Sequence, residues 1–419
     1  MSTETVKIQR FGQHGDGIAV QDNGPVYIPF ALPGEEVAIA RVGNQGTLMS
    51  IAHASPDRRE PACRHFGPDG EGGACGGCSL QHLKDAPYHA FKRQLVIDAL
   101  KSKGITTDVS EIVIARPGER RRLVMAARKT EKGILLGFNQ AQSHHIVSIV
   151  ECPIAVPGIV AQLPAIRAIA AALAVNAEPF KIAVLETQSG LDLSVDGIAK
   201  LTDAQRRKAV ETVLALRGIA RLSLGTEILV EPVKPQVDFG GVTVAPMAGG
   251  FVQATKPAED AMADLVMAHG GKSKKVADLF SGAGTFALRL AKRAMVHAVE
   301  SEAGALAALD FAARNTQGLK PVKAERRDLF RRPITASELK IFDAVVFDPP
   351  RAGAEAQCRE LARSKVKTVA AVSCNPLTLA RDLSILIEGG YRIKSVTPID
   401  QFLWSPHVEV VALLEKNAS

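Results

Sequence analysis

The sequence predicts a multidomain α/β protein with an open parallel sheet in its last part. Its 419 residues exceed the size of one ordinary domain. From about residue 250 onward, short apolar segments alternate with helical patterns, as in parallel strands joined by crossover helices. Near the start, glycines separate short β-branched segments at the close spacing of a small β-barrel. We therefore expect three domains, over residues 1–55, 56–248 and 249–419.

Local patterns predict the elements of the first two domains. In the first domain, strands are expected at VKIQRF, GIAV, VYIPFAL and EVAIARV. The second domain is predicted to be of the mixed α+β class. Thr202 is expected to cap a helix there. The segments expected in this domain are a helix over 88–104, a strand over 132–139, an Ala/Leu-rich helix over 157–174 and an amphipathic helix over 202–218.

The third domain has strands at VADLF, VHAVE, FDAVVFD and KTVAAVS, and a later strand at VEVVALL. Ligands on parallel sheets bind at the carboxyl ends of the strands. The residues just after each strand are therefore the ones to examine.

A glycine-rich turn, DLFSGAGT, ends the first of these strands. Gly282 and Gly284 let a ligand approach the backbone where the next helix, FALRLAKRA, is expected to begin. Glu300 ends the second strand 22 residues after Asp278, where a carboxylate accepts hydrogen bonds from a ribose diol. The pattern D-x-F-x-G-x-G differs from the pyrophosphate-binding G-x-G-x-x-G, which favours S-adenosylmethionine over NAD. The alternative is a turn that only happens to contain glycines.

Other strands end on acidic or nucleophilic side chains. Asp348 follows FDAVVF and precedes two prolines, which hold it extended at the sheet edge. Cys374 lies between a strand and a helix that opens with Pro376. Because a helix amino end favours an anion, we expect the Cys374 thiolate to form readily; the alternative is a cysteine that only packs. Glu409 begins the last strand at the same edge.

Four of the six cysteines lie before the last domain, at Cys63, Cys75, Cys78 and Cys152. The C-x-x-C spacing with intervening glycines is typical of a metal site. Four thiolates bind either zinc or an iron–sulfur cluster, and spacing alone does not decide between them. Unrelated buried cysteines are the alternative.

Lys and Arg exceed Asp and Glu by 51 − 44 = 7, which permits a polyanionic partner. Basic residues cluster in one segment and are expected to grip phosphates; a solvated face is the alternative. No signal peptide or membrane-spanning run is visible, so we expect a cytoplasmic monomer without a membrane partner. The cluster comprises Arg116, Arg120, Arg121, Arg122, Arg128, Lys129 and Lys132.

The motifs DLFSGAGTFAL, FDPPRAG, SCNP and HVEVVAL, in this order, resemble those of the uracil-5 RNA methyltransferases, and the resemblance covers nearly the whole chain. It implies a Rossmann-like, S-adenosylmethionine-dependent methyltransferase sheet. The segment GDGIAV…VYIPFALPGEEV is similar to a TRAM domain, a small OB-like RNA-binding barrel. CGGC, together with Cys63 and Cys152, resembles the site that holds a 4Fe–4S cluster in the ribosomal RNA members; zinc remains the alternative.

The resemblance also implies roles for single residues. Cys374 would be the nucleophile that adds to uracil carbon 6, Glu409 the base, and Asp348 the group that holds the uracil edge. Thr255 and Thr285 stand where members often have Asn, and the 12-residue spacing from Cys63 to Cys75 exceeds the usual six. The residues implied in S-adenosylmethionine binding are Gln253, Phe280, Gly282, Thr285, Glu300, Asp328 and Asp348.

The implied activity is the formation of 5-methyluridine in RNA, with 23S ribosomal RNA as the expected substrate. Transfer RNA is the alternative substrate. A non-catalytic RNA-binding protein with a relic methyltransferase fold is the alternative from another class.

Overall fold

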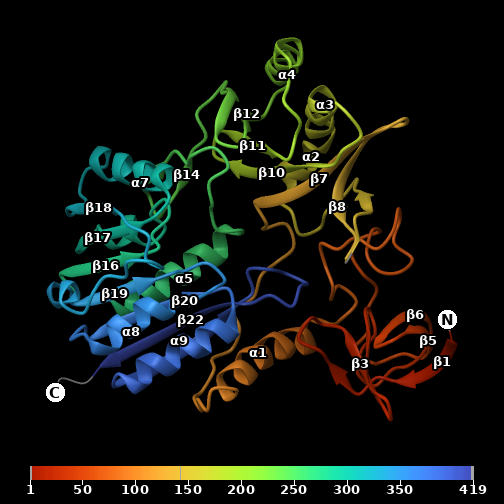
Figure 1. Cartoon of the computed structure of the whole chain (residues 1–419), viewed down its shortest axis with the longest axis horizontal. Coiled ribbons are helices and arrows are strands. Elements are labelled where there is room, and N and C mark those ends of the chain that lie inside the picture. The colour runs from red at the N-terminus through yellow and green to blue at the C-terminus, as the bar shows by residue number, and fades with distance from the viewer. Residues whose placement is uncertain (1, 142, 417–419) are drawn as a thin grey trace.

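Figure 1 shows a computed structural model of the protein, which describes residues 2–141 and 143–416. Three larger sheets follow one another along the described chain, with a short β-ribbon before the last of them. None of the helices in these ranges has both the length and the apolar character needed to cross a membrane.

The first sheet has the strand order β1-β5-β6-β4-β3-β2 and encloses a small core of its own, which includes Val26, Ile28, Val37 and Ile39. Every strand expected in this region overlaps an observed one, so these predictions are confirmed. The strands are β1 (Ser2–Lys7), β2 (Arg10–Phe11), β3 (Gly17–Gln21), β4 (Gly24–Ile28), β5 (Glu36–Val42) and β6 (Gln45–His53).

The second sheet has the order β13-β12-β11-β10-β7-β8-β9. Its strands are β7 (Arg122–Thr130), β8 (Gly133–Asn139), β9 (Ile146–Ser148), β10 (Phe180–Thr187), β11 (Gly190–Asp196), β12 (Ile219–Leu224) and β13 (Glu227–Val230). The other elements of this part are α1 (Asp85–Lys101), α2 (Pro157–Ala161), α3 (Leu163–Leu173), α4 (Asp203–Ala215), β14 (Val237–Asp238) and β15 (Thr243–Val244).

Two local predictions in this part have different outcomes. The Thr202 cap of α4 is confirmed, because its side chain accepts from the Gln205 N–H and the Gln205 side-chain oxygen accepts from the Thr202 N–H. The single helix expected over 157–174 is wrong, because the chain breaks at Gln162 into α2 and α3. Pro164 has no N–H to donate to the preceding turn, which explains the break.

The third sheet has the order β18-β17-β16-β19-β20-β22-β21. β16 pairs in parallel with β17 and β19, whereas β22 lies antiparallel between β20 and β21. The strands are β16 (Lys275–Leu279), β17 (Met295–Glu300), β18 (Val322–Arg326), β19 (Ala344–Phe347), β20 (Thr368–Ser373), β21 (Tyr391–Ile399) and β22 (Glu409–Lys416). The helices are α5 (Lys256–His269), α6 (Ala287–Leu290), α7 (Ala303–Asn315), the 3-10 helix η1 (Glu338–Ile341), α8 (Glu355–Arg363) and α9 (Pro376–Glu388).

The parallel sheet with crossover helices is therefore confirmed, with two differences in detail. The patterns did not single out β18 and β21. The helix expected at FALRLAKRA is shorter, because only Ala287–Leu290 is α-helical. Beyond it, the Lys292 and Arg293 N–H groups bond to carbonyls three residues earlier, which tightens the chain into turns.

Helix α1 packs on the third sheet although it precedes the second in sequence. It contacts α9 and β21, and its Val96 and Leu100 belong to the same core as Leu383 and Val396 (Figure 1). A buried ion pair between Lys92 Nζ and Asp400 Oδ1, 2.5 Å apart, fixes α1 to the segment between β21 and β22. This segment leads directly into Glu409, so α1 helps to position one edge of the sheet.

Candidate active site

The predicted site residues come together because strand direction places them at one edge. The parallel strands β16, β17, β19 and β20 end at this edge. β22 runs the other way, so its first residue, Glu409, pairs with Ile399 at the same edge. Asp348 and Cys374 follow β19 and β20 directly.

The glycine turn after β16 has room for a ligand. Phe280 and Gly282 have positive φ values of 60° and 53°. A Cβ on Gly282 would meet no atom within 4 Å, so the backbone there is open to close approach. Gly284, with φ of 102°, has no such room, because a Cβ would lie 2.9 Å from Leu288. Gly282 is thus the position that a ligand can approach.

Glu300 is held against this turn. Its Oε2 accepts from the Gly282 N–H at 3.0 Å, and its Oε1 accepts from the Glu302 N–H at 2.8 Å. Beneath the turn, both carboxylate oxygens of Asp278 and the Ser281 hydroxyl are buried without a partner among the described residues. Burial raises the pKa of Asp278 well above its usual value, with Asp348 and Glu300 adding to the effect. Unpartnered polar atoms beside an open turn fit a polar ligand.

Two aromatic rings flank the same region. The Phe280 and Phe330 ring centroids lie 5.4 Å apart, and Phe330 is 49% exposed. Phe330 follows Asp328, whose Oδ1 accepts from the Phe330 and Arg331 N–H groups in the loop after β18. The rings offer apolar surface suited to a purine. Asp328 shapes this loop, and Phe330 is a candidate that the sequence patterns did not indicate.

Asp348 lies beside the predicted cofactor residue Gln253. The Gln253 amide Nε2 donates to Asp348 Oδ2 at 3.0 Å, and Gln253 is buried. Burial raises the pKa of Asp348 to about 7, and the bond from Gln253 opposes this rise. Asp348 therefore holds a proton more readily than an exposed carboxyl group.

Glu409 is held by a second glutamine that sequence reasoning missed. Gln401 Nε2 donates to Glu409 Oε2 at 2.9 Å, while Gln401 Oε1 accepts from the Ala254 N–H at 3.1 Å. Gln401 and Glu409 are each 2% exposed. Burial raises the pKa of Glu409 well above its usual value, and the charge of Asp348 adds to the rise. Ala254 follows Gln253 in the chain. One short segment therefore carries both the glutamine that binds Asp348 and the backbone N–H that holds Gln401, the glutamine that binds Glu409.

Cys374 lies half-buried beside the two carboxylates. As expected, Pro376 is in the first turn of α9, and the helix ends at Gly389. The expected ease of thiolate formation is not what the structure shows, because the pKa of Cys374 is raised to about 11. Burial is the main cause, Glu409 and Asp348 add to it, and Arg351 opposes it. Two nearby negative charges and a loss of hydration outweigh the helix end.

The two threonines that depart from the family pattern have structural contacts. The Thr255 hydroxyl caps α5 by accepting from the Ala258 N–H at 3.2 Å. Thr285 lies half-buried in the glycine turn, and its carbonyl accepts from Arg289 Nη1 at 2.7 Å. The Thr285 hydroxyl is thus at the turn where a ligand approaches.

The four predicted metal ligands converge although they come from distant parts of the chain. They line one small cavity of about 20 Å³ together with Phe138 and Pro153. Burial raises the pKa of each thiol, that of Cys152 to about 11, and the neighbouring thiols contribute for Cys63, Cys78 and Cys152. The donor set of four sulfurs fits a thiolate-bound group. Within the described ranges, however, no three His, Cys, Asp or Glu side chains are placed to hold a metal ion together.

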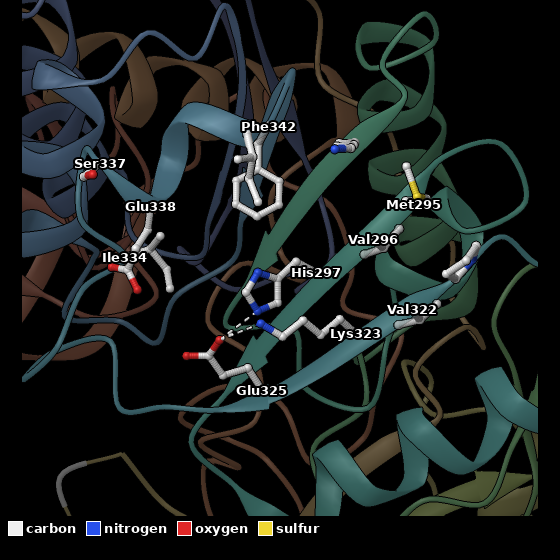
Figure 2. A pocket seen from close by; sticks show the side chains of 13 residues that line it. Met295, Val296, His297, Val322, Lys323, Glu325, Ile334, Ser337, Glu338 and Phe342 are labelled. Carbon is white, nitrogen blue, oxygen red and sulfur yellow. Dashed lines mark hydrogen bonds and ion pairs between the residues drawn. The ribbon is translucent and has the colours of Figure 1, made fainter.

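A larger cavity, of about 510 Å³, lies away from these residues. Figure 2 shows His297 and Lys323 directed at Glu325, with His297 Nε2 2.8 Å from Glu325 Oε2. Lys275 and Met295, the first residues of β16 and β17, form part of its wall. It therefore lies toward the strand ends opposite Cys374, and no predicted site residue lines it.

Comparison with known proteins identifies the family of this chain. The family described as tRNA (Uracil-5-)-methyltransferase matches residues 236–417. The 23S rRNA (uracil(1939)-C(5))-methyltransferase RlmD of Vibrio campbellii is 32% identical, over 99% of this chain and 96% of that protein. The chain belongs to the uracil-5 RNA methyltransferase family. It is an RNA (uracil-5-)-methyltransferase that uses S-adenosyl-L-methionine.

Two other matches agree with this. A protein of Agrobacterium fabrum named as an RNA methyltransferase is 70% identical to this enzyme, over 99% of this chain and all of its own. The structure of a tRNA (uracil-54, C5)-methyltransferase of Pyrococcus abyssi, in complex with S-adenosyl-L-homocysteine, has a TM-score of 0.75. It covers 98% of this chain and 99% of its own at 22% identity, so it supports the fold.

Proposed function

We propose that this methyltransferase acts on a uridine of 23S ribosomal RNA through a covalent bond between Cys374 and the base. The observation that carries the mechanism is the grouping of Cys374, Asp348 and Glu409 at one sheet edge, beside the glycine turn. The choice of ribosomal RNA is supported by the Vibrio campbellii relative, which matches over nearly the whole chain. The three proposed domains are those over 1–55, 56–248 and 249–419, and the first is proposed to be a TRAM-type barrel.

The nucleophile makes carbon 5 of uracil reactive. The Cys374 thiol gives its proton to solvent water, the thiolate sulfur adds to carbon 6, and the electron pair of the 5,6 double bond moves onto the uracil oxygen at carbon 4. Asp348 is proposed to hold the polar edge of the base. Burial favours its protonated form, which can donate a hydrogen bond to the developing charge. Carbon 5 then has the electron density to accept a methyl group.

Glu409 completes the reaction. After methylation, its carboxylate takes the proton from carbon 5, the double bond re-forms, and the bond from Cys374 to carbon 6 breaks. Gln401 keeps the carboxylate directed into the site and stabilises its charged form. Since burial and Asp348 favour the protonated form, proton removal requires that Asp348 is neutral or shielded at that moment.

S-Adenosylmethionine supplies an electrophilic methyl group when bound. The residues proposed to hold it are Gln253, Phe280, Gly282, Thr285, Glu300, Asp328 and Asp348. Glu300 is suited to the ribose hydroxyls, and the open Gly282 backbone permits close contact. Phe280, with Phe330, offers the apolar surface for the adenine. The unpartnered Asp278 and Ser281 lie under the same turn.

We further propose that Cys63, Cys75, Cys78 and Cys152 bind a 4Fe–4S cluster that orders the RNA-binding loops. Their convergence around one cavity supports this, and zinc is the alternative that fits the same donors. A brown preparation with absorbance near about 400 nm is expected for the cluster. A colourless protein that carries zinc would exclude it.

The deciding experiment is methyl transfer from labelled S-adenosylmethionine to unmodified 23S ribosomal RNA and to transfer RNA, with the products identified by nucleoside mass spectrometry. We expect 5-methyluridine in the ribosomal RNA. Label only in transfer RNA would keep the chemistry and overturn the substrate. No label in either RNA, with cofactor bound, would contradict the proposal as a whole.

A further inference from the structure

The seven basic residues that cluster in the sequence do not stay together in the fold. Arg121 is buried and pairs with Glu259 at 2.6 Å, so it joins the second sheet to α5. Lys129 and Lys132 lie in and beside the hairpin of β7 and β8. Arg116 is exposed, and Arg128 lies within β7. Arg120 lies just before β7 and Arg122 is its first residue; both are half-buried.

These two arginines belong to a row of cations and aromatic rings. The Arg122 guanidinium carbon lies 5.2 Å from the Phe251 ring centroid, and that of Arg120 lies 5.7 Å from the Phe402 centroid. Arg120 Nε donates to the Arg122 carbonyl at 3.1 Å, which links the two. The outer end of the row is open, because Phe251 is 63% exposed.

The inner end of the row reaches the nucleophile. The Phe402 and His407 rings lie 6.1 Å apart, edge to face, and Arg351 Nη2 lies 3.5 Å from His407 Nδ1. Arg351 is close enough to Cys374 to lower the pKa of its thiol. The row therefore runs from the reacting sulfur toward solvent.

The two arginines at the centre of the row are partly buried cations. Burial lowers the pKa of both Arg120 and Arg122, and Arg120 lowers that of Arg122 further. Within the part of the chain that the structure describes, neither guanidinium forms an ion pair with a carboxylate, whereas Arg121 and Arg289 do. Cys78 and Cys152 oppose the lowering for Arg120. Two partly desolvated guanidinium groups without a carboxylate partner fit a bound phosphate.

We propose that Arg120 and Arg122 bind phosphates of the RNA strand next to the target uridine, with a neighbouring base against Phe251. Alternating rings and guanidinium groups suit a single strand, since bases stack on rings while arginines hold the backbone. The inference rests on RNA as the substrate and on Cys374 as the reacting residue. It does not depend on which RNA is methylated.

The test uses the full-length enzyme, unmodified 23S ribosomal RNA transcript and a series of KCl concentrations. Arg120→Gln and Arg122→Gln should each weaken RNA binding and lower the slope of log Kd against log salt by about 1. KM for RNA should rise while kcat stays close to that of the wild type. Arg207→Gln, on the exposed face of α4 far from the sheet edge, is the matched control and should change neither.

Three results would overturn the inference: an unchanged salt slope in both variants, an equal loss in Arg207→Gln, or a fall in kcat alone. Arg120 also lies near Cys78 and Cys152, so its variant is checked by visible absorption and by S-adenosylmethionine binding. Arg122 has no such neighbour. If Arg120→Gln perturbs the cysteines, the result for Arg122→Gln decides the test. Failure of the wild type to methylate any RNA would reject the proposed function. The slope of log Kd against log salt would still show whether Arg120 and Arg122 bind RNA phosphates.

Discussion

The sheet edge around Cys374 and the cavity around Cys78 both hold half-buried thiols with raised pKa values, but they are built differently. At the edge, strands place the reacting groups, and glutamine amides hold the two carboxylates. The cysteine cavity is lined by loops, and the described residues form no ready three-ligand group there. The first site is organised by the fold itself. The second brings four sulfur donors around one cavity, and we propose that a bound group completes it.

The largest expected effect tests whether methyl transfer takes place at the sheet edge around Cys374. Cys374→Ala should reduce methyl transfer by roughly 10³-fold or more, because the nucleophile is lost. Binding of S-adenosylmethionine, measured by calorimetry, should not change. The matched control is Cys358→Ala. Cys358 lies on α8, where it packs into the hydrophobic core, so this variant should retain turnover. Activity of Cys374→Ala near that of the control would exclude the covalent mechanism.

The next effect separates the two reaction steps at the edge. Glu409→Gln keeps the shape of the side chain but removes the base, so turnover should fall by about 10²-fold or more. The adduct between Cys374 and methylated RNA should then accumulate. A shifted band on a denaturing gel measures it. Absence of that band, with RNA still bound, would count against the role of Glu409.

A substitution at the cysteine cavity tests whether this site is separate from the reaction at the sheet edge. Cys78→Ser should remove the visible absorbance and lower the melting temperature, because the bound group links several loops. The rate of the chemical step should fall less than in Glu409→Gln, since Cys78 lies outside the sheet edge. Single-turnover kinetics measure this step. A loss of chemistry as complete as that of Cys374→Ala would break the distinction between the two sites.

A smaller effect concerns the glutamine that holds the base. Gln401→Leu removes a bond to the charged form of Glu409, so the pKa of Glu409 should rise further. Less of the base is then ionised at a given pH. The rate near pH 7 should fall roughly tenfold and recover as the pH rises. The pH profile of kcat distinguishes this from a merely structural loss, which would lower the rate equally at every pH.

The smallest effect concerns the cofactor pocket. Phe330→Leu keeps an apolar side chain but removes the ring that lies 5.4 Å from Phe280. The Kd for S-adenosylmethionine should rise a few-fold, about the value of one aromatic contact. Phe311→Leu, at a similarly exposed position on α7, is the control. Equal Kd values for both variants would remove Phe330 from the pocket.

Strand ends were the most predictable part of this protein. Asp348, Cys374 and Glu409 could be placed together from sequence because strand direction decides where each end lies. Gln401 and Phe330 could not, since their roles depend on contacts between segments far apart in the chain. The pKa of Cys374 was misjudged for the same reason: the helix end is local, whereas burial and the two carboxylates arise only in the fold. The break at Gln162 could have been read from Pro164, which is favoured in the first turn of a helix and disfavoured within one.

The reversed strand β22 also affects the order in which the enzyme becomes competent during its synthesis. Domains fold as units while the chain emerges from the ribosome. Cys374 emerges well before Glu409, yet β22 lies between β20 and β21 and must be inserted to join them. The same strand that closes the sheet also brings the base. If Cys374 and Glu409 have the proposed roles, a nascent chain that has the nucleophile but lacks the base also lacks the strand that completes its sheet.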